Sequence, residues 1–387
     1  PPKPSSAASD VYKRQMKNLY ITLSFALASM TLTAQNSDTE KADRLFARFE
    51  YVDAANEYLK LAESKKADSY VYKQLAESYF NVFNTKEASR WYARAVEQQQ
   101  DAETYYRYAQ MLKAEGKYAE SNAQMKKFAS LAPSDHRAVE FKQDPDYLPK
   151  LKSQTKLFDE KALDINSDKS DFGAVLTNDN YLYFASARNK ARKNYGWNEE
   201  PFLDLYKSVR NADGTFSEPV PVTEVNTKFH DGPATVSADG NTMYFASESF
   251  NEGDFERDKA KKLKYGQVYL YKATKDGDKW GNVKALPFTS KAYSTSNPSL
   301  SKDGKTLYFS SNMPGSIGGN DVWKVAVNAD GSFGTPENLG KSVNTEGNES
   351  FPFITDDNKL YFSSDGRKGF GALDVFVICL LYTSDAA

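Results

Sequence analysis

The chain contains few residues of the types that perform acid–base or metal chemistry. Its 387 residues include two histidines, His136 and His230, and one cysteine, Cys379. No Ser-His-Asp order, His-Glu-x-x-His motif or zinc-ligand spacing occurs around them. His230 lies in a connector between repeats, where other copies have Ser170 and Asn348. We therefore expect its side chain to be solvated rather than catalytic.

Two kinds of turn could bind a ligand in another context. The glycine-rich loop at residues 314–319 could hold a phosphate, but it lacks the lysine and the following helix of a P-loop. The Asp-Gly turns, as at residues 213–214 and 330–331, offer one or two carboxylates where calcium requires six or more oxygens. We expect no catalytic, no cofactor-binding and no metal-binding residue, and hence no enzyme.

The charges of the chain are nearly balanced, with 50 basic and 52 acidic residues. The basic stretch at residues 259–264 follows an acidic stretch at residues 252–258, which cancels its field. The composition therefore predicts no nucleic-acid partner.

Four short aromatic strands organise the larger part of the chain. Each follows a turn of Asp, Asn or Gly, residues that tolerate turn conformations. Their shared phenylalanine recurs at spacings of 61, 64 and 53 residues, at Phe184, Phe245, Phe309 and Phe362. A period of this size is typical of stacked units such as propeller blades. The predicted strands span residues 181–186, 243–247, 307–311 and 360–364.

Each repeat contains the parts of a four-stranded blade. A first strand, the aromatic strand, a third strand after a variable loop, and a fourth strand after an Asp-Gly hairpin complete the unit. We predict a β-propeller over residues 156–377, with four visible blades of which the last is incomplete. A shared connector pairs Asn-Ser or Asn-Thr with a later acid: Asn166-Ser167 with Asp171, Asn226-Thr227 with Asp231, and Asn344-Thr345 with Glu349.

Residues 157–163 occupy the place that a fourth strand holds in the other repeats. The segment therefore resembles the outer strand of a blade whose other three strands come from the far end of the chain, a pairing that would protect an open edge. A closed ring of four blades is possible, but we favour a ring of five or six blades that has been cut short. In such a shortened chain we expect residues 157–163 either to pair wrongly with blade four or to be poorly ordered.

Residues 39–147 show a helical pattern with a period of 33 residues. Small residues recur at Ala55, Ala88 and Ser121, and again at Ala76 and Ala109. The first copy departs from the pattern, with Asp43 at a small-residue position. The pattern resembles the tetratricopeptide repeat, whose unit is two antiparallel helices. The fold class is therefore α+β multidomain, with an N-terminal α-solenoid followed by a truncated all-β propeller.

The N-terminus carries the features of an export signal. Lys17 supplies a positive charge before the apolar residues 19–32, so we predict a secretory signal peptide at residues 16–34. Cleavage is expected after Ala34, with Ala28 as the alternative, and no nearby cysteine is available for lipidation. Residues 1–15 and 378–387 are expected to be non-native flanks.

The blades resemble the TolB-like propeller repeat, through their aromatic strands, their connectors and the loop at residues 314–321. With the helical repeats and the signal peptide, the chain is similar to Bacteroidota envelope proteins of the OmpA family. Some members belong to the type IX secretion and gliding apparatus. The resemblance implies a periplasmic, outer-membrane-associated protein without a transmembrane span. It also implies contact with peptidoglycan only through an OmpA-like domain that this chain does not contain.

We therefore expect a non-enzymatic envelope scaffold that binds other envelope proteins through its two repeat surfaces. The alternative is a propeller-based hydrolase, or a protein that binds a small ligand or glycan, since propeller centres can host such sites. Convergence of several polar residues at the central channel would discriminate between them. The resemblance places a protein-binding face on the concave side of the solenoid, at Tyr70, Lys73, Glu77, Phe80, Tyr106, Gln110 and Lys113.

Overall fold

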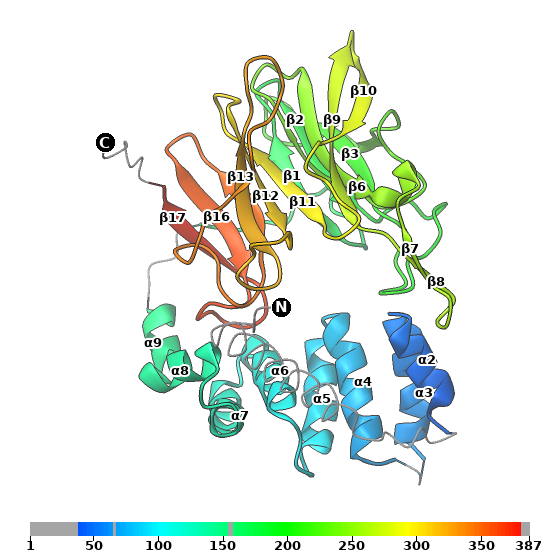
Figure 1. Ribbon diagram of the computed structural model, residues 1–387, viewed down its shortest axis with the longest axis vertical. Coiled ribbons are helices and arrows are strands. Elements are labelled where there is room, and N and C mark those ends of the chain that lie inside the picture. Colours follow the sequence, from blue (N-terminus) through cyan, green and yellow to red (C-terminus); the bar gives the residue numbers. More distant parts are fainter. Residues whose placement is uncertain (1–37, 65–66, 154–157, 381–387) are drawn as a thin grey trace, which may run out of the picture.

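The computed structural model describes residues 38–64, 67–153 and 158–380. The predicted signal peptide at 16–34, the flank at 1–15 and the tail from residue 381 lie outside these ranges. Within them, no helix has both the length and the apolar character needed to cross a bilayer. A helical domain (residues 40–152) lies beneath a propeller-like set of sheets (residues 171–379) (Figure 1).

The helical domain is built from consecutive helices that pack on their neighbours. Four of them begin at an Asp or Asn whose side chain accepts a hydrogen bond from the backbone two or three residues ahead. Such N-caps satisfy amides that the helix itself leaves without a partner. The helices are α2 (Glu40–Ala47), α3 (Tyr51–Ala62), α4 (Ser69–Asn81), α5 (Thr85–Ala95), α6 (Ala102–Ala114), α7 (Tyr118–Leu131), α8 (His136–Gln143) and α9 (Tyr147–Lys152).

The periodic small residues of the helical domain are buried where helices meet. Ala76, Ala88 and Ala109 have no exposed surface, which allows the helices to approach closely. Asp43, the residue that breaks the pattern, accepts hydrogen bonds from the phenol groups of Tyr58 (2.5 Å) and Tyr70 (2.7 Å). The first helix pair therefore replaces a small residue by a partly buried polar cluster.

Four antiparallel sheets form the propeller, and the first strands of adjacent blades lie side by side around its centre (Figure 1). Blade one contains β1 (Asp171–Leu176), β2 (Tyr181–Ser186), β3 (Asp204–Val209) and β4 (Val220–Pro221). Blade two contains β5 (Asp231–Val236), β6 (Thr242–Glu248), β9 (Val268–Asp276) and β10 (Lys279–Ala285), and its loop adds η1 (Ser249–Glu252), β7 (Glu256–Asp258) and β8 (Leu263–Tyr265). Blade three contains β11 (Thr295–Leu300), β12 (Thr306–Ser311), β13 (Asp321–Ala326) and β14 (Glu337–Asn338). Blade four contains β15 (Glu349–Ile354), β16 (Lys359–Ser364) and β17 (Asp374–Cys379).

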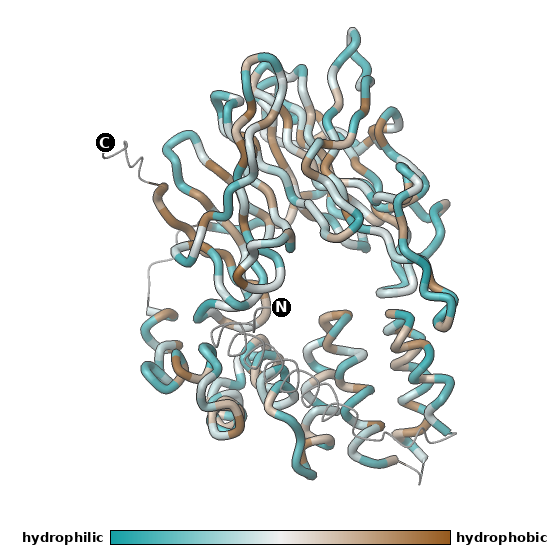
Figure 2. Tube along the Cα trace, in the orientation of Figure 1, coloured by the Kyte–Doolittle hydropathy of each residue, from teal (hydrophilic) through white to brown (hydrophobic). Residues whose placement is uncertain are grey.

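The predicted aromatic strands are confirmed as the second strands β2, β6, β12 and β16. Their phenylalanines are 5% exposed or less, because each strand lies between the first and third strands of its own blade, and those of blades two to four also pack on the preceding blade. Figure 2 shows the apolar segments along the strands and the hydrophilic segments at many of the turns.

The shared connector forms a repeated polar latch between blades. In blade two, Asn226 accepts from the amide of Leu205 (2.8 Å) and donates to the carbonyl of Leu205 (3.0 Å). Asp231 then accepts from the backbone of Thr227 and from the hydroxyl of Ser247. Asp231 and Ser247 are buried and Asn226 is partly buried, so these polar groups need their partners to offset the loss of water. Blade four repeats the latch with Asn344, Thr345, Glu349 and Ser364.

Two observations concern the ends of the propeller. Residues 158–163 form no strand, and Phe158 is 62% exposed, with its ring 5.9 Å from the ring of Tyr361 in blade four. Within the described residues, blade four therefore has three strands. Its last strand also continues through Ile378 and Cys379, beyond the predicted end at residue 377, because these residues pair with Leu360 and Lys359.

The helical domain contacts the loops that join second and third strands of the blades. The indole of Trp197 donates to the carbonyl of Asn81 (2.8 Å), and the phenol of Tyr147 donates to the carbonyl of Gly369 (2.6 Å). Trp197 also stacks on Phe49, at 6.2 Å between ring centroids. These contacts hold the loops of blades one and four against the helices.

Candidate functional site

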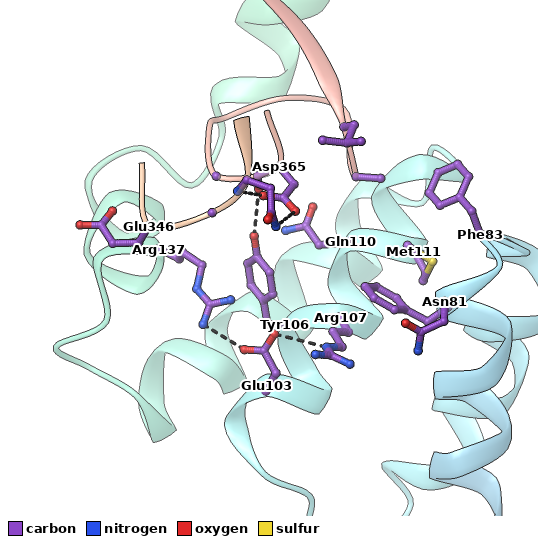
Figure 3. A pocket seen from close by; sticks show the side chains of 16 residues that line it. Asn81, Phe83, Glu103, Tyr106, Arg107, Gln110, Met111, Arg137, Glu346 and Asp365 are labelled. Atoms are coloured by element: carbon purple, nitrogen blue, oxygen red, sulfur yellow. Dashed lines mark hydrogen bonds and ion pairs between the residues drawn. The ribbon is translucent and has the colours of Figure 1, made fainter. Parts of the chain in front are cut away.

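A cavity of about 550 Å³ lies between the helical domain and the propeller (Figure 3). We call it the interdomain cavity. Its helical wall comes mainly from α4 and α6, and its propeller wall from the loops around Asn348, Asp365 and Leu373. Tyr106 extends from α6 across it and donates to the carbonyl of Asp365 at 3.3 Å (Figure 3).

The principal charged groups on the helical wall of the interdomain cavity are already paired. Glu103 accepts from Arg107 (3.3 Å) and from Arg137 (2.9 Å) (Figure 3). Arg107 also pairs with the buried Glu77, and Arg137 lies over the ring of Tyr106 at 4.1 Å. A ligand would have to compete with these pairs, so the charged groups of this wall are poorly available for binding or catalysis despite the size of the cavity.

The predicted protein-binding residues are divided between internal contacts and this cavity. Phe80, Tyr106 and Gln110 line the cavity, and Lys113 is buried beside it under the propeller. The other three make contacts within the helical domain: Tyr70 with Asp43, Lys73 with Asp101, and Glu77 with Tyr92 and Arg107. The propeller of the same chain thus covers part of the expected face, and binding of a second protein there stays a prediction.

The first strands of the four blades surround an apolar channel of about 350 Å³. Phenylalanine and proline side chains line it, and Phe172 packs edge-on against Phe351 across blades one and four at 5.9 Å. The channel shares Phe172, Pro233 and Asn297 with a second cavity of about 400 Å³ at its end. We call this second space the mouth cavity.

Polar residues from two neighbouring blades converge on the mouth cavity. Glu200 and Tyr195 come from the loop between β2 and β3, His230 precedes β5, and Glu248 ends β6. Tyr195 stacks on Trp197, which the helical domain holds in place. The helical domain thereby braces one wall of the cavity.

His230 is held as a neutral imidazole with a defined tautomer. Its Nδ1 accepts a hydrogen bond from the amide of Leu203 (3.0 Å), so in the neutral ring the proton sits on Nε2. Nε2 is buried and makes no hydrogen bond within the described residues. Burial lowers the pKa of His230 to about 4, and the expectation that this side chain is solvated is wrong.

Glu248 lies beside His230, with 4.0 Å between its carboxyl oxygen and Nε2. Burial raises the pKa of Glu248 to about 7, although the backbone of His230 donates to its carboxyl. A carboxyl group of this kind is still substantially protonated at neutral pH. Raised pKa values in a cavity are typical of functional sites, although structural groups can also show them.

Glu200 supplies the second carboxyl of the mouth cavity. It accepts from the hydroxyl of Ser170 (2.5 Å) and from the backbone of Ser170 (3.3 Å). In blade one, Ala187 stands where blade two has Glu248, so Glu200 reaches in from the loop to cap the first strand instead. Two carboxyls therefore flank one cavity from adjacent blades.

This convergence was not predicted from the sequence, because the expectation concerned the first strands, which carry no repeated histidine. Glu200, His230 and Glu248 stand in loops or at strand ends, outside the repeated pattern. The available signal was a difference between copies: the position after the buried serine is Ala187, Glu248, Asn312 or Asp365 in the four blades.

No protein-family profile and no curated protein sequence matches the chain. Solved structures do match it. A protein assigned as TolB from Agrobacterium tumefaciens is 19% identical with a TM-score of 0.32, over 52% of this chain and 58% of that one. A thermostable family-43 glycoside hydrolase is 10% identical with a TM-score of 0.36, over 53% of this chain and 69% of that one. A puromycin hydrolase is 15% identical with a TM-score of 0.33, over 54% of this chain and 39% of that one.

These matches correct one expectation. The predicted non-enzymatic scaffold is contradicted, because the matched structures are mostly hydrolases, including peptidases and glycoside hydrolases. The chain spans less than two thirds of the TolB and puromycin hydrolase structures, and the similarity is weak, so it assigns no activity here. The similarity agrees with the propeller arrangement, and any activity has to be argued from the residues of this chain.

Proposed function

We propose that the chain is a hydrolase that cleaves a glycosidic bond of a neutral sugar in the mouth cavity. The observation that carries the proposal is the pair of carboxyls, Glu248 and Glu200, that line one cavity from adjacent blades. Burial raises the pKa of Glu248 to about 7, which keeps a proton available near neutral pH.

The lining of the mouth cavity favours a neutral, hydroxyl-rich ligand. Among its described residues none is lysine or arginine, so an anionic ligand would meet two carboxyls and no opposing cation. The amides of Asn198 and Asn297 and the hydroxyls of Ser170 and Ser296 offer donors and acceptors of the kind that sugar hydroxyls require. The ring of Tyr195 adds an apolar face, as ligand sites commonly do.

The two carboxyls suit the two roles of glycoside hydrolysis. One carboxylic acid gives its proton to the leaving oxygen, while the other carboxylate activates a water or attacks the sugar carbon. Glu248 is the protonated partner, and its position beside the Nε2 hydrogen of His230 fixes where a substrate oxygen would be placed. Glu200, already held by Ser170, is the second carboxylate.

The test is hydrolysis of aryl glycosides of neutral pentoses and hexoses, with release of the aryl group followed by absorbance. We expect Glu248→Gln and Glu200→Gln each to lower kcat/KM by about 10²–10⁴-fold, the range for loss of an acid or base group. Activity of the wild type should fall as pH rises through about 7, because Glu248 then loses the proton it must donate.

Asp365→Asn provides the matched control. Asp365 holds the position in blade four that Glu248 holds in blade two, but it lies in the interdomain cavity rather than the mouth cavity. Its variant should keep wild-type kcat/KM within about twofold. Hydrolysis is refuted if no glycoside of the panel is turned over while sugars still raise the melting temperature equally in wild type and Glu248→Gln. The chain would then be a glycan-binding protein.

Finer assignments rest on sequence pattern and remain proposals. Helices α2 to α7 are proposed to be three tetratricopeptide repeats, supported by the 33-residue period and the buried alanines at helix crossings. Relationship to Bacteroidota OmpA-family envelope proteins and periplasmic location rest on the predicted signal peptide at residues 16–34. N-terminal sequencing of protein from the periplasmic fraction should begin at Gln35, and retention of Met16 in the cytoplasm would refute export.

A further inference from the structure

A second cluster of charged groups lies where α6 and α9 meet the loop between β16 and β17. Lys113 of α6 is only 8% exposed. No hydrogen bond or ion pair to its ammonium occurs within the described residues; its contact is the ring of Tyr147, 5.6 Å away. Burying a charge without a counter-ion is costly, and burial lowers the pKa of Lys113 to about 8.

The propeller loop brings a second ammonium to the same place. The ammonium of Lys368 lies 6.0 Å from the centroid of the Tyr147 ring, so ammonium groups from the two domains approach the same ring. Gly371 fixes the loop on α6: a Cβ there would lie 2.8 Å from the carbonyl oxygen of Gln110 and from the amide of Ala114. A glycine with φ of +121° allows this close approach.

Arg367 adds a third cation that has no carboxylate partner within the described residues. Its Nη2 donates to the carbonyls of Ser342 (2.7 Å) and Val343 (2.8 Å), while Nε is buried without a partner. Arg367 and Lys368 line both a small space of about 40 Å³, shared with Lys113, and an adjoining space of about 440 Å³. We call these two spaces together the junction cavity.

The carboxylates near the junction cavity do not neutralise these cations. Glu140 lies 3.8 Å from His136, and Glu346 lies 3.4 Å from the same imidazole. Asp374 acts on Lys113 through space but accepts its hydrogen bond from the amide of Gly371. Of the other cations of the wall, Arg137 is already paired with Glu103 and Asp135, while Lys341 lines the larger space.

We infer that the junction cavity binds a small oxyanion, a phosphate or carboxylate group, between Lys113 and Lys368. The anion would supply the counter-charge that the described residues lack, and charge-assisted hydrogen bonds to ammonium groups are the strong ones. Because one lysine belongs to the helical domain and the other to the propeller, bound anion would also couple the two domains. This inference is independent of the hydrolysis proposed for the mouth cavity.

The test is thermal unfolding of the full chain at pH 7 in sodium phosphate, sodium acetate and sodium chloride of equal ionic strength. We expect a saturable rise in melting temperature, of about 3 °C or more, with one or both oxyanions over chloride. A rise with phosphate alone identifies a phosphate site, and a rise with both identifies a general oxyanion site. An equal effect of chloride would mean screening only and would overturn the inference.

Two variants and a matched control separate the site from an effect on folding. Lys113→Met removes the buried charge and should raise the melting temperature in chloride while abolishing the additional rise with the oxyanion. Lys368→Met should lose the additional rise as well. Lys127→Met, at an exposed lysine on α7, should keep it. Retention of the full oxyanion effect in Lys113→Met would refute the site.

Discussion

Blades two and four place the same kind of residue at the same backbone position with different results. In blade four, Asp365 accepts from the backbone amide (2.7 Å) and the side-chain amide (3.0 Å) of Asn348. In blade two, Glu248 has one methylene more and faces His230, whose Nε2 stays 4.0 Å away. The carboxylate of Asp365 is satisfied by Asn348, whereas Glu248 and His230 are partly buried and leave the buried Nε2 without a hydrogen bond beside a cavity. Function in this ring is therefore proposed where a repeat departs from its own capping pattern.

The largest expected effect comes from installing the blade-four pair in blade two. The double variant His230→Asn, Glu248→Asp should let the new carboxylate accept from the new asparagine, and such hydrogen bonds favour the ionised form. The acid would be withdrawn and deprotonated, so we expect kcat/KM for aryl glycosides to fall by about 10²-fold or more. Wild-type turnover by a folded double variant would show that the carboxyl of Glu248 has no role as an acid.

The second prediction concerns the stability cost of Glu248. Its pKa is higher in the folded chain, about 7 against 4.5, so its burial opposes folding above pH 4.5 and does so fully above pH 7. The difference corresponds to about 3 kcal/mol. Glu248→Gln should therefore gain about 3 kcal/mol of unfolding free energy relative to wild type between pH 4 and pH 8, measured by urea denaturation. Asp365→Asn should show no comparable gain.

If Glu248→Gln and Asp365→Asn changed the pH dependence of the unfolding free energy equally, burial of Glu248 would not explain the difference between blades two and four. A gain for Glu248→Gln together with a loss of activity would instead show that the site is kept at the expense of stability, as functional sites commonly are.

The third prediction uses the imidazole of the same pair. The pKa of His230 is lower in the folded chain, about 4 against 6.5, so its contribution to stability is full above pH 6.5 and is lost as pH falls toward 4. At pH 5 wild type should have lost about 2 kcal/mol from this group. His230→Asn, with the blade-four residue, should lack that part of the acid destabilisation. An unchanged pH profile of the variant would mean that the pKa of the ring is the same in the folded and the unfolded chain.

Sequence pattern predicted the repeated parts of the fold, and the physical reason is visible in particular residues. Phe245 and its counterparts recur because every blade needs an apolar strand between two others, and Asn226 and Asn344 recur because each latch must satisfy a buried backbone amide and carbonyl. These roles could be predicted from the sequence because the same residues recur in the blades. Analogy of position places residues 157–163 as an outer strand, but it cannot show whether a partner edge is available, and residues 158–163 form no strand.

The candidate sites could not be predicted in the same way. Glu200 and Glu248 are separated by 48 positions, and only closure of two blades around a channel brings them to one cavity. Lys113 had the pattern of an exposed groove residue, and it is buried because the propeller of the same chain folds onto α6. Residues that do not recur between repeats, and that meet only in the folded chain, produce no periodic pattern in the sequence.

The smallest expected effect tests the other difference between the two blades, the number of strands. Blade two has β10 as a seven-residue fourth strand, while within the described residues blade four ends at β17, with the ring of Phe158 lying 5.9 Å from that of Tyr361. Because Phe158 is 62% exposed, Phe158→Ala should lower the free energy of unfolding by only about 0.5 kcal/mol, the low end for an aromatic pair. Trp280→Ala, at a 5% exposed position in β10, should cost about 3–5 kcal/mol. A loss of more than about 2 kcal/mol for Phe158→Ala would mean that residues 158–163 protect the edge of blade four as a fourth strand would, despite forming no ladder with it.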